Sequence, residues 1–194
     1  MIGPTGAGKT TLGLQFVAEG LRQGDRCLFV NFDENPAQLR RQLNYLGVDP
    51  SGAGGENLSL LYVSPVELQI DSIVNAIIEH IREGGVRRIV IDSLSNLHAA
   101  TTDANRPQSY LYALSQHFAV VGVASFLTLE TLGAGAGETH FSAMSDNIFV
   151  LGIQLGQTPR RTVRVAKARV AGLKAPGPGS AGCRPGAALG TLPT

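Results

Sequence analysis

The sequence predicts an α/β domain with a mostly parallel central sheet, helices on both faces and an antiparallel hairpin at the C-terminal end. From Ile2 to about Ala168, segments with helix-like spacing of apolar residues alternate with short apolar runs typical of buried strands. This alternation requires crossover connections, which build parallel sheets covered by helices. The last two strand-like segments are separated only by a short turn, which predicts the hairpin.

The expected helices carry apolar residues at every third or fourth position. The first covers residues 10–22 and ends before Gly24, and Pro36 opens a second that ends at Gly47. Two more helices are expected over residues 70–82 and about 107–118.

The expected strands are rich in Val, Ile, Leu and Phe. They cover residues 26–32, 58–63, 86–91 and 120–129. The hairpin strands are expected over residues 147–155 and 161–168, with a turn at 156–159.

Composition and charge are those of a globular protein without a strong charge bias. The chain has 194 residues, 43% apolar and 16% charged, and a formal net charge of +1. No overall charge bias therefore argues for nucleic acid or a membrane surface as a partner, and no stretch is long and apolar enough to span a membrane. The two cysteines, Cys27 and Cys183, provide neither a disulfide framework nor a zinc site, which suits a reducing cytoplasm.

The two ends of the chain differ from the rest. Only Met1 and Ile2 precede Gly3, so the strand that should lead into the following loop is nearly absent. Residues 170–194 are rich in Gly and Pro and contain no acidic residue. We therefore expect a folded domain over residues 1–169, a disordered tail over 170–194, and ends like those of a fragment.

The strongest functional signal is the segment GPTGAGKT, Gly3 to Thr10, which satisfies the pattern G-x-x-x-x-G-K-[ST]. Glycines let backbone N–H groups converge on phosphate oxygens, and the N-terminus of the following helix favours the same anion. Lys9 is expected to reach the β- and γ-phosphates, and the Thr10 hydroxyl to bind Mg²⁺. The predicted nucleotide-binding residues are Gly3, Pro4, Thr5, Gly6, Ala7, Gly8, Lys9, Thr10 and Thr11.

Two acidic segments follow predicted strands. Asp92 ends an apolar strand, at the sheet edge where ligands bind in open α/β sheets, so we expect it to hold Mg²⁺ with help from Ser93. Asp33 and Glu34 end the neighbouring strand, where a carboxylate can activate the attacking water. Glu34 is the preferred catalytic base and Asp33 the second candidate, although acidic residues also favour helix N-termini without any catalytic role.

Two weaker signals lie further along the chain. Glu130 closes the strand expected over residues 120–129 and either senses the γ-phosphate or joins a salt bridge. The basic hairpin strand, RRTVRVAKAR, is either a solvated sheet edge or a cationic finger offered to the nucleotide of another subunit.

Taken together, these segments resemble the KaiC family, circadian-clock-type ATPases of the RecA superfamily. The likeness covers about residues 1–169 and rests on six segments in the family's order: GPTGAGKTTLGLQF, FDENP, IDSLSNL, LTLE, SDNIFVLGI and KAR. The resemblance implies a RecA-like P-loop fold, ATP with Mg²⁺, and a homo-hexameric ring with ATP between subunits. It also implies that Lys167 and Arg169 reach the neighbouring subunit's nucleotide, and that a signalling or clock-type protein is the partner.

The sequence departs from the family at two functional points. The family continues after its Lys-x-Arg with Gly-Ser-x-His, whereas this chain reads Val170-Ala171. Clock-type kinase domains carry a Ser-Thr pair before the SDN strand, and here the pair is Ser142-Ala143, which leaves Ser142 as the candidate phosphoacceptor.

The leading hypothesis is therefore a cytoplasmic ATP-hydrolysing domain that acts through nucleotide-dependent ring assembly. One alternative is a RecA- or RadA-like DNA-dependent ATPase, whose DNA loops would lie over residues 99–106 and 132–140; both loops are poor in Lys, Arg and aromatic residues. The others are a nucleotide switch that does not hydrolyse ATP and a serine autokinase acting at Ser142.

Overall fold

The computed structural model describes residues 1–49, 55–64, 69–99, 106–131, 144–156 and 159–169. The chain divides into two compact units: residues 9–130 form the larger one, and residues 1–8 with the chain from residue 131 onward form the smaller one. A single domain over residues 1–169 stays a prediction, and the expected disordered tail lies outside the described residues.

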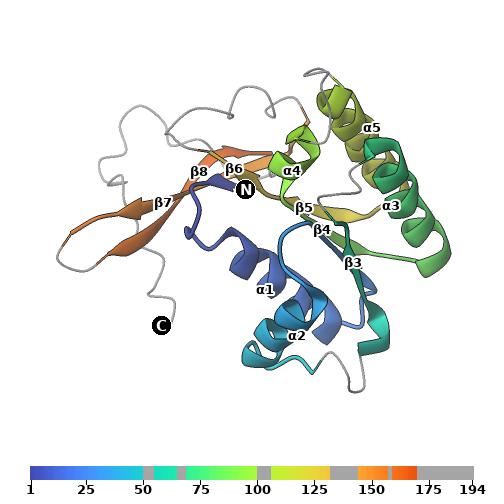
Figure 1. The fold of residues 1–194 in the computed structure, drawn as a ribbon, viewed down its shortest axis with the longest axis horizontal. Helices are drawn as coiled ribbons and strands as arrows, with labels where there is room; N and C mark the ends of the chain where they lie inside the picture. Colours follow the sequence, from blue (N-terminus) through green and yellow to red (C-terminus); the bar gives the residue numbers. More distant parts are fainter. Residues whose placement is uncertain (50–54, 65–68, 100–105, 132–143, 157–158, 170–194) are drawn as a thin grey trace. The chain divides into compact units, whose positions relative to one another are not determined.

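The larger unit contains a parallel sheet with the strand order β3-β2-β4-β5 (Figure 1). These strands are β2 (Cys27–Asn31), β3 (Leu58–Tyr62), β4 (Arg88–Asp92) and β5 (Ala124–Leu127). Every neighbouring pair is parallel, with Cys27 opposite both Leu58 and Arg88. The carboxyl ends of all four strands therefore meet at one edge of the sheet.

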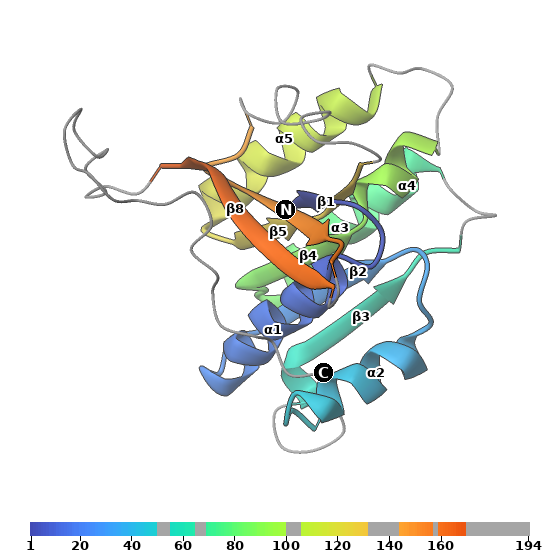
Figure 2. The same ribbon diagram turned by 90° about the vertical axis from the view of Figure 1, so that its left-hand side faces the viewer.

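Helices cover both faces of this sheet. Figures 1 and 2 show α1 (Lys9–Arg22) and α2 (Pro36–Tyr45) on one face, and α3 (Ile70–Gly84) and α5 (Arg106–Val121) on the other. Alternate strand residues explain the arrangement, because successive side chains point to opposite faces. The core beneath α1 and α2 is made of Leu14, Val17, Ala18, Cys27, Phe29, Leu39, Leu43, Val48, Leu58 and Val90.

Local signals set the ends of the helices. Asn35 caps α2 in an extended conformation, and its side chain and that of Gln38 each accept a hydrogen bond from the other residue's backbone N–H. Pro36 occupies the first turn, where a missing N–H costs nothing. The start of α2 is therefore fixed directly after Asp33 and Glu34.

In the larger unit, the structure shifts one expected strand and adds two short elements that the sequence did not predict. The strand expected over residues 120–129 begins later, because Val120 and Val121 complete α5 and Gly122, with φ +70°, ends it. Helix α4 (Leu94–Ala99) and the 3₁₀ turn η1 (Gly55–Asn57) were not expected, since both are too short to show a period. The short strand β6 (Leu129–Glu130) follows β5.

The smaller unit contains the hairpin that the sequence predicted. Strands β7 (Asn147–Gln154) and β8 (Arg160–Ala168) pair antiparallel, with a bulge between Ile148 and Phe149. The two-residue strand β1 (Ile2–Gly3) pairs parallel with β7, with Ile2 opposite Val150. Among the described helices, none has both the length and the apolar character needed to cross a membrane.

Candidate nucleotide-binding site

The centre of the candidate site is Asp92, the last residue of β4. One carboxylate oxygen, Oδ2, accepts a hydrogen bond of 2.7 Å from the hydroxyl of Thr10 in the first turn of α1. The other, Oδ1, accepts a hydrogen bond from the hydroxyl of Thr128. Asp92 is only 7% exposed, and a buried carboxylate requires such partners. The structure therefore brings together the two residues predicted to bind the metal.

Lys9 lies one residue before Thr10, at the N-terminus of α1. Its side chain is buried, with 8% relative exposure. Burial lowers the pKa of its ammonium group, while the negative charges of Glu130 and Asp92 oppose that effect. A buried cation close to two carboxylates, at the N-terminus of a helix, suits the binding of a polyanion.

The two adjacent carboxylates after β2 are held by side-chain amides. Asp33 Oδ2 accepts a hydrogen bond of 3.0 Å from Asn96 in α4, and Glu34 Oε2 accepts one of 2.8 Å from Gln42 in α2. Asn31, the last residue of β2, accepts a hydrogen bond of 3.1 Å from the Asp33 N–H and donates one to the Glu34 carbonyl. The sequence reasoning missed Asn31 and Asn96, because a strand-end Asn and a helical Asn carry no distinctive pattern.

Glu34 differs from an ordinary surface glutamate in its electrostatics. Burial raises its pKa, and the negative charges of Asp92 and Asp33 raise it further, while the hydrogen bond from Gln42 opposes the rise. A carboxylate with a raised pKa is a stronger base than usual. This property suits the role that the sequence predicted for Glu34.

Negative charges lie close together at this edge of the sheet. Asp92 and Asp33 both raise the pKa of Glu34, and Glu130 and Asp92 both act on the Lys9 ammonium group. Within the described part of the chain, no cluster of three or more His, Cys, Asp or Glu has metal-binding geometry. Mg²⁺ fits this donor set nevertheless, because it commonly takes one or two protein oxygens and completes its shell with water and phosphate. Thr10 and Asp92 provide such a pair.

Helix α4 is tied to the end of β5 and to β6. The Leu94 N–H donates to the Thr128 carbonyl at 2.9 Å, and the Glu130 N–H donates to Ser95 Oγ at 3.0 Å. Ser93 is buried beside Asp92, and the peptide between them is cis. These contacts place Glu130 at the same edge as Asp92. The sequence reasoning found Glu130 but missed Thr128 and Ser95.

The remaining part of the glycine-rich loop belongs to the smaller unit. Gly6 and Gly8 have φ angles of +78° and +98°, which glycine adopts without strain. A Cβ on Gly3 would lie 2.8 Å from the Leu151 carbonyl oxygen in β7, so only glycine fits there. Pro4 is half-buried, Ala7 is buried, and Thr5 and, in α1, Thr11 are exposed.

Lys167 and Arg169, the predicted residues for a neighbouring subunit, contact their own chain just before β7. Lys167 Nζ donates to the Ser145 carbonyl at 2.7 Å, and the Arg169 guanidinium lies 3.7 Å from Asp146 Oδ1. The Arg169 N–H also donates to the Asp146 carbonyl at 2.9 Å. The segments SDN and KAR, far apart in sequence, are therefore joined at one end of the hairpin. Ser142 and most of both candidate DNA loops lie outside the described residues.

The fold and the site together define a P-loop domain of the RecA type. A glycine-rich loop leads into α1, and α1 places its first threonine on the aspartate that ends a central parallel strand. The solved structure of a KaiC-like protein from Pyrococcus horikoshii OT3 matches 87% of this chain and 77% of its own, with a TM-score of 0.74 and 24% identity. At that identity the likeness shows the fold alone.

Sequence comparison places the chain more narrowly. The model of the KaiC ATPase family matches residues 1–175, and the chain belongs to this family. The circadian clock oscillator protein KaiC of Picosynechococcus sp. is 30% identical over 173 residues, and that of Rippkaea orientalis is 31% identical over 173 residues. Each alignment covers 86% of this chain and 33% of the relative, so the chain spans about a third of the length of these curated relatives.

Proposed function

We propose that this domain binds ATP with Mg²⁺, hydrolyses it to ADP and phosphate, and acts in the cytoplasm through nucleotide-dependent assembly of a homo-hexameric ring. The observation that carries the proposal is the 2.7 Å hydrogen bond between Thr10 and Asp92, with Lys9 buried beside them. This pair is the arrangement that a P-loop domain uses for its metal. The choice of ATP over GTP rests on the family.

Each site residue has a role in phosphate binding. Backbone N–H groups of the glycine-rich loop, other than that of Ala7, which donates to the Pro4 carbonyl, cradle the phosphates together with the N-terminus of α1, and Lys9 neutralises the β- and γ-phosphates. Thr10 and Asp92 would hold Mg²⁺, which would offset the negative charge of the phosphates. Glu130 lies within electrostatic range of Lys9 and senses the γ-phosphate through it.

Glu34 acts on the water molecule that attacks the γ-phosphate. Its carboxylate takes a proton from the water as the water oxygen bonds to the γ-phosphorus, and the bond from that phosphorus to the bridging oxygen breaks to release ADP. The raised pKa of Glu34 favours this role, since the base must be strong enough to accept the proton. Asp33 is the second candidate. The hydrogen bonds from Asn96 and Gln42 position the two carboxylates. Asn31 fixes the backbone that carries them, because it accepts from the Asp33 N–H and donates to the Glu34 carbonyl.

Lys167 and Arg169 reach the nucleotide bound by a neighbouring subunit, so that each site depends on two chains. In the single chain they contact Ser145 and Asp146, and the Arg169–Asp146 pair is exposed on both sides. Exposed ion pairs contribute little free energy, so a neighbour's phosphates can compete for the guanidinium at low cost. We propose that the ring forms when ATP provides this competing anion, and that a signalling or clock-type protein reads the assembled state.

Two substitutions test the binding site in the full chain. Lys9→Ala removes the buried ammonium group, and we expect loss of both nucleotide affinity and phosphate release. Thr10→Val keeps the shape of the side chain but removes the hydroxyl, and we expect the effect of Mg²⁺ on affinity to fall sharply. Titration of a fluorescent N-methylanthraniloyl-ATP, with and without EDTA, measures both. Unchanged binding in Lys9→Ala would falsify the proposal.

Native mass spectrometry tests the assembly. We expect hexamers with ATP and Mg²⁺, and smaller species with Lys167→Ala and Arg169→Ala. A ring that forms equally well without nucleotide contradicts the proposed role of ATP.

A further inference from the structure

One cross-strand pair of the hairpin lies against the glycine-rich loop. Ile153 in β7 is directly opposite Arg161 in β8, so their side chains share a face of the ribbon. A Cβ built on Gly6 would lie 3.9 Å from Ile153 Cδ1, and one built on Gly8 would lie 3.8 Å from Arg161 Cδ. Both side chains therefore lie close to the loop, and all these residues belong to the smaller unit.

Arg161 also bonds to the loop. Its Nε–H donates to the Gly6 carbonyl oxygen at 3.2 Å. The same peptide unit carries the N–H of Ala7, which donates to the Pro4 carbonyl at 3.2 Å. Because a peptide unit is planar, hydrogen bonds at its oxygen and at its N–H together determine its orientation.

This peptide is flanked by the two most permissive residues of the loop. Gly6 and Gly8 both have positive φ angles, and glycine is the residue that loses most conformational freedom when it is ordered. Without an external contact, phosphate binding would have to supply that ordering. A loop that is already ordered binds its ligand more tightly.

We propose that Arg161 is a positioning residue that pre-orders the phosphate loop of its own chain through the Gly6 carbonyl. The inference rests on the proposed nucleotide binding and adds a residue that the family resemblance did not single out. Arg161 holds the carbonyl oxygen of the loop, whereas phosphate is bound by N–H groups, so the two contacts do not compete. Lys167 lies six residues further along β8, about 20 Å away at 3.3 Å per residue, which separates Arg161 from the residues proposed to act on a neighbour.

Loss of this contact is expected to leave the fold intact. Arg161 is exposed, so water can replace its hydrogen bond, and the pairing of β7 with β8 runs through the backbone from Asn147–Ala168 to Gln154–Arg160. A change at Arg161 therefore alters the loop and not the hairpin. This allows binding and stability to be measured separately.

The experiment uses four full-length variants: Arg161→Gln, Arg161→Lys, the adjacent Arg160→Gln as a matched charge control, and Lys9→Ala. Binding is measured with N-methylanthraniloyl-ATP and Mg²⁺, and with inorganic pyrophosphate as a competitor that engages only the phosphate site. We expect Arg161→Gln and Arg161→Lys to weaken binding of both by about 10- to 150-fold, the range for loss of one hydrogen bond from a charged group. We expect Arg160→Gln to resemble the unmodified chain.

Kinetics and hydrogen exchange distinguish a positioning role of Arg161 from a role in the chemical step or a general effect of its charge. For Arg161→Gln we expect KM to rise while kcat stays within about twofold, because the residues proposed to act on the water are unchanged. Without nucleotide, the Ala7 amide should exchange faster in Arg161→Gln than in Arg160→Gln. Full affinity in Arg161→Lys would show that charge alone matters, and equal weakening in Arg160→Gln would show a general effect of charge; either result overturns the inference.

Failure of the proposed nucleotide binding can be distinguished from failure of the Arg161 inference. If the unmodified chain and Lys9→Ala both fail to bind nucleotide, the nucleotide proposal is wrong. The exchange rate of Ala7 still tests the contact between Arg161 and the loop in that case. Equal exchange in Arg161→Gln and Arg160→Gln overturns it.

Discussion

The two edges of the parallel sheet in the larger unit carry polar networks that differ in how their charges are arranged. Helix α1 connects them, because Thr10 in its first turn contacts Asp92 at the carboxyl edge and Phe16 in its middle contacts Arg88, the first residue of β4, at the amino edge. At the amino edge Arg88 pairs with the opposite charge of Asp25. At the carboxyl edge the like charges of Asp92 and Asp33 lie near Glu34.

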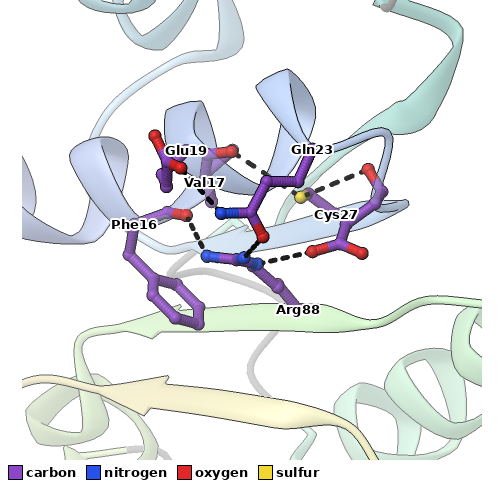
Figure 3. A network of polar contacts seen from close by, with 7 residues as sticks. Phe16, Val17, Glu19, Gln23, Cys27 and Arg88 are labelled. Atoms are coloured by element: carbon purple, nitrogen blue, oxygen red, sulfur yellow. Dashed lines mark hydrogen bonds and ion pairs between the residues drawn. The ribbon is translucent and has the colours of Figure 1, made fainter.

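Figure 3 shows the amino-edge network around Arg88. All three guanidinium nitrogens donate: Nε to Asp25 at 2.7 Å, one terminal nitrogen to Gln23 Oε1 at 2.7 Å, and the other to the Phe16 carbonyl at 3.3 Å. The guanidinium also lies 5.1 Å from the centre of the Phe16 ring, a cation–π distance. This network needs no ligand to be complete.

The carboxyl edge, by comparison, brings like charges together. Glu34 has a raised pKa because it is partly buried near the negative charges of Asp92 and Asp33. Such crowding of carboxylates is unfavourable in the protein alone and is relieved by a cation. The comparison shows that like charges lie near one another at the carboxyl edge, whereas opposite charges are paired at the amino edge, so the carboxyl edge is the better candidate for binding a cation.

The largest expected effect comes from Glu34→Gln, which removes the base and leaves the hydrogen bond with Gln42 possible. We expect ATP turnover to fall by about 10²- to 10⁴-fold, the range for loss of a general base, with nucleotide affinity retained. In the unmodified chain, turnover should fall as the pH drops through the raised pKa of Glu34, because the protonated acid cannot accept a proton. Phosphate release measured against pH checks both points.

Asp33→Asn provides the comparison for that experiment. We expect a smaller loss of turnover than with Glu34→Gln. If Asp33→Asn is the more damaging change, the assignment of the two carboxylates is reversed.

At the amino edge, Arg88→Met breaks the matched network. Its side chain is 16% exposed and that of Asp25 is 29% exposed, so the substitution leaves a half-buried carboxylate without its cation. We expect a loss of about 2–3 kcal/mol in the free energy of unfolding, measured by urea denaturation. Arg82→Met is the control, because the Arg82–Glu83 pair is 68% and 73% exposed and such pairs contribute little. Equal effects of the two changes would contradict the comparison.

Gly20→Ala tests how closely α1 approaches the same network. A Cβ on Gly20 would lie 2.6 Å from Arg88 Cδ and 2.8 Å from Cys27 Sγ. Overpacking typically costs about 1–3 kcal/mol, which exceeds the gain in helix propensity of about 1 kcal/mol. Gly84→Ala in α3 is the control, since its nearest neighbour would be Val86 at 3.6 Å. Thermal denaturation should show a lower Tm for Gly20→Ala only.

The reactivity of the Cys27 thiol measures whether the amino edge of the sheet stays buried in the folded chain. Burial raises the pKa of its thiol to about 11. At pH 8 the thiolate that reacts with alkylating agents is therefore scarce. In a Cys183→Ser chain, we expect iodoacetamide to label Cys27 far more slowly than it does after urea denaturation. Rapid labelling of the folded chain, followed by mass spectrometry, would contradict a closed edge.

The smallest expected effect concerns stability and pH at the carboxyl edge. The folded chain holds a proton on Glu34 more tightly than the unfolded chain does, because its pKa is raised from 4.5. The free energy of unfolding that Glu34 contributes must therefore decrease as the pH rises from 4.5 through the raised pKa. Glu34→Gln should be slightly more stable than the unmodified chain at pH 7 and no more stable at pH 4. Urea midpoints at the two pH values measure this difference.

Much of the fold could be predicted from local patterns. The helices at 9–22, 36–45 and 70–84 and the strands at 27–31, 58–62 and 88–92 follow from apolar spacing, Pro36 and the helix-ending glycines. The start of β5 could not be placed, because Val120 and Val121 favour a strand locally but complete α5. Helix α4 was missed because a helix of that length shows no period.

The sequence by itself determined the chemistry of the candidate site: a phosphate-loop pattern ending in Lys9 and Thr10, and carboxylates at strand ends. Residues that form a motif of fixed spacing, or that directly follow a predicted strand, can be recognised without knowing which distant residues surround them in the fold. Only the tertiary structure decided which distant groups meet, such as Thr128 with Asp92, Asn96 with Asp33, and Arg161 with Gly6. These contacts join residues 36, 63 and 155 positions apart, and no local propensity encodes them, because they depend on how the sheet aligns its strands.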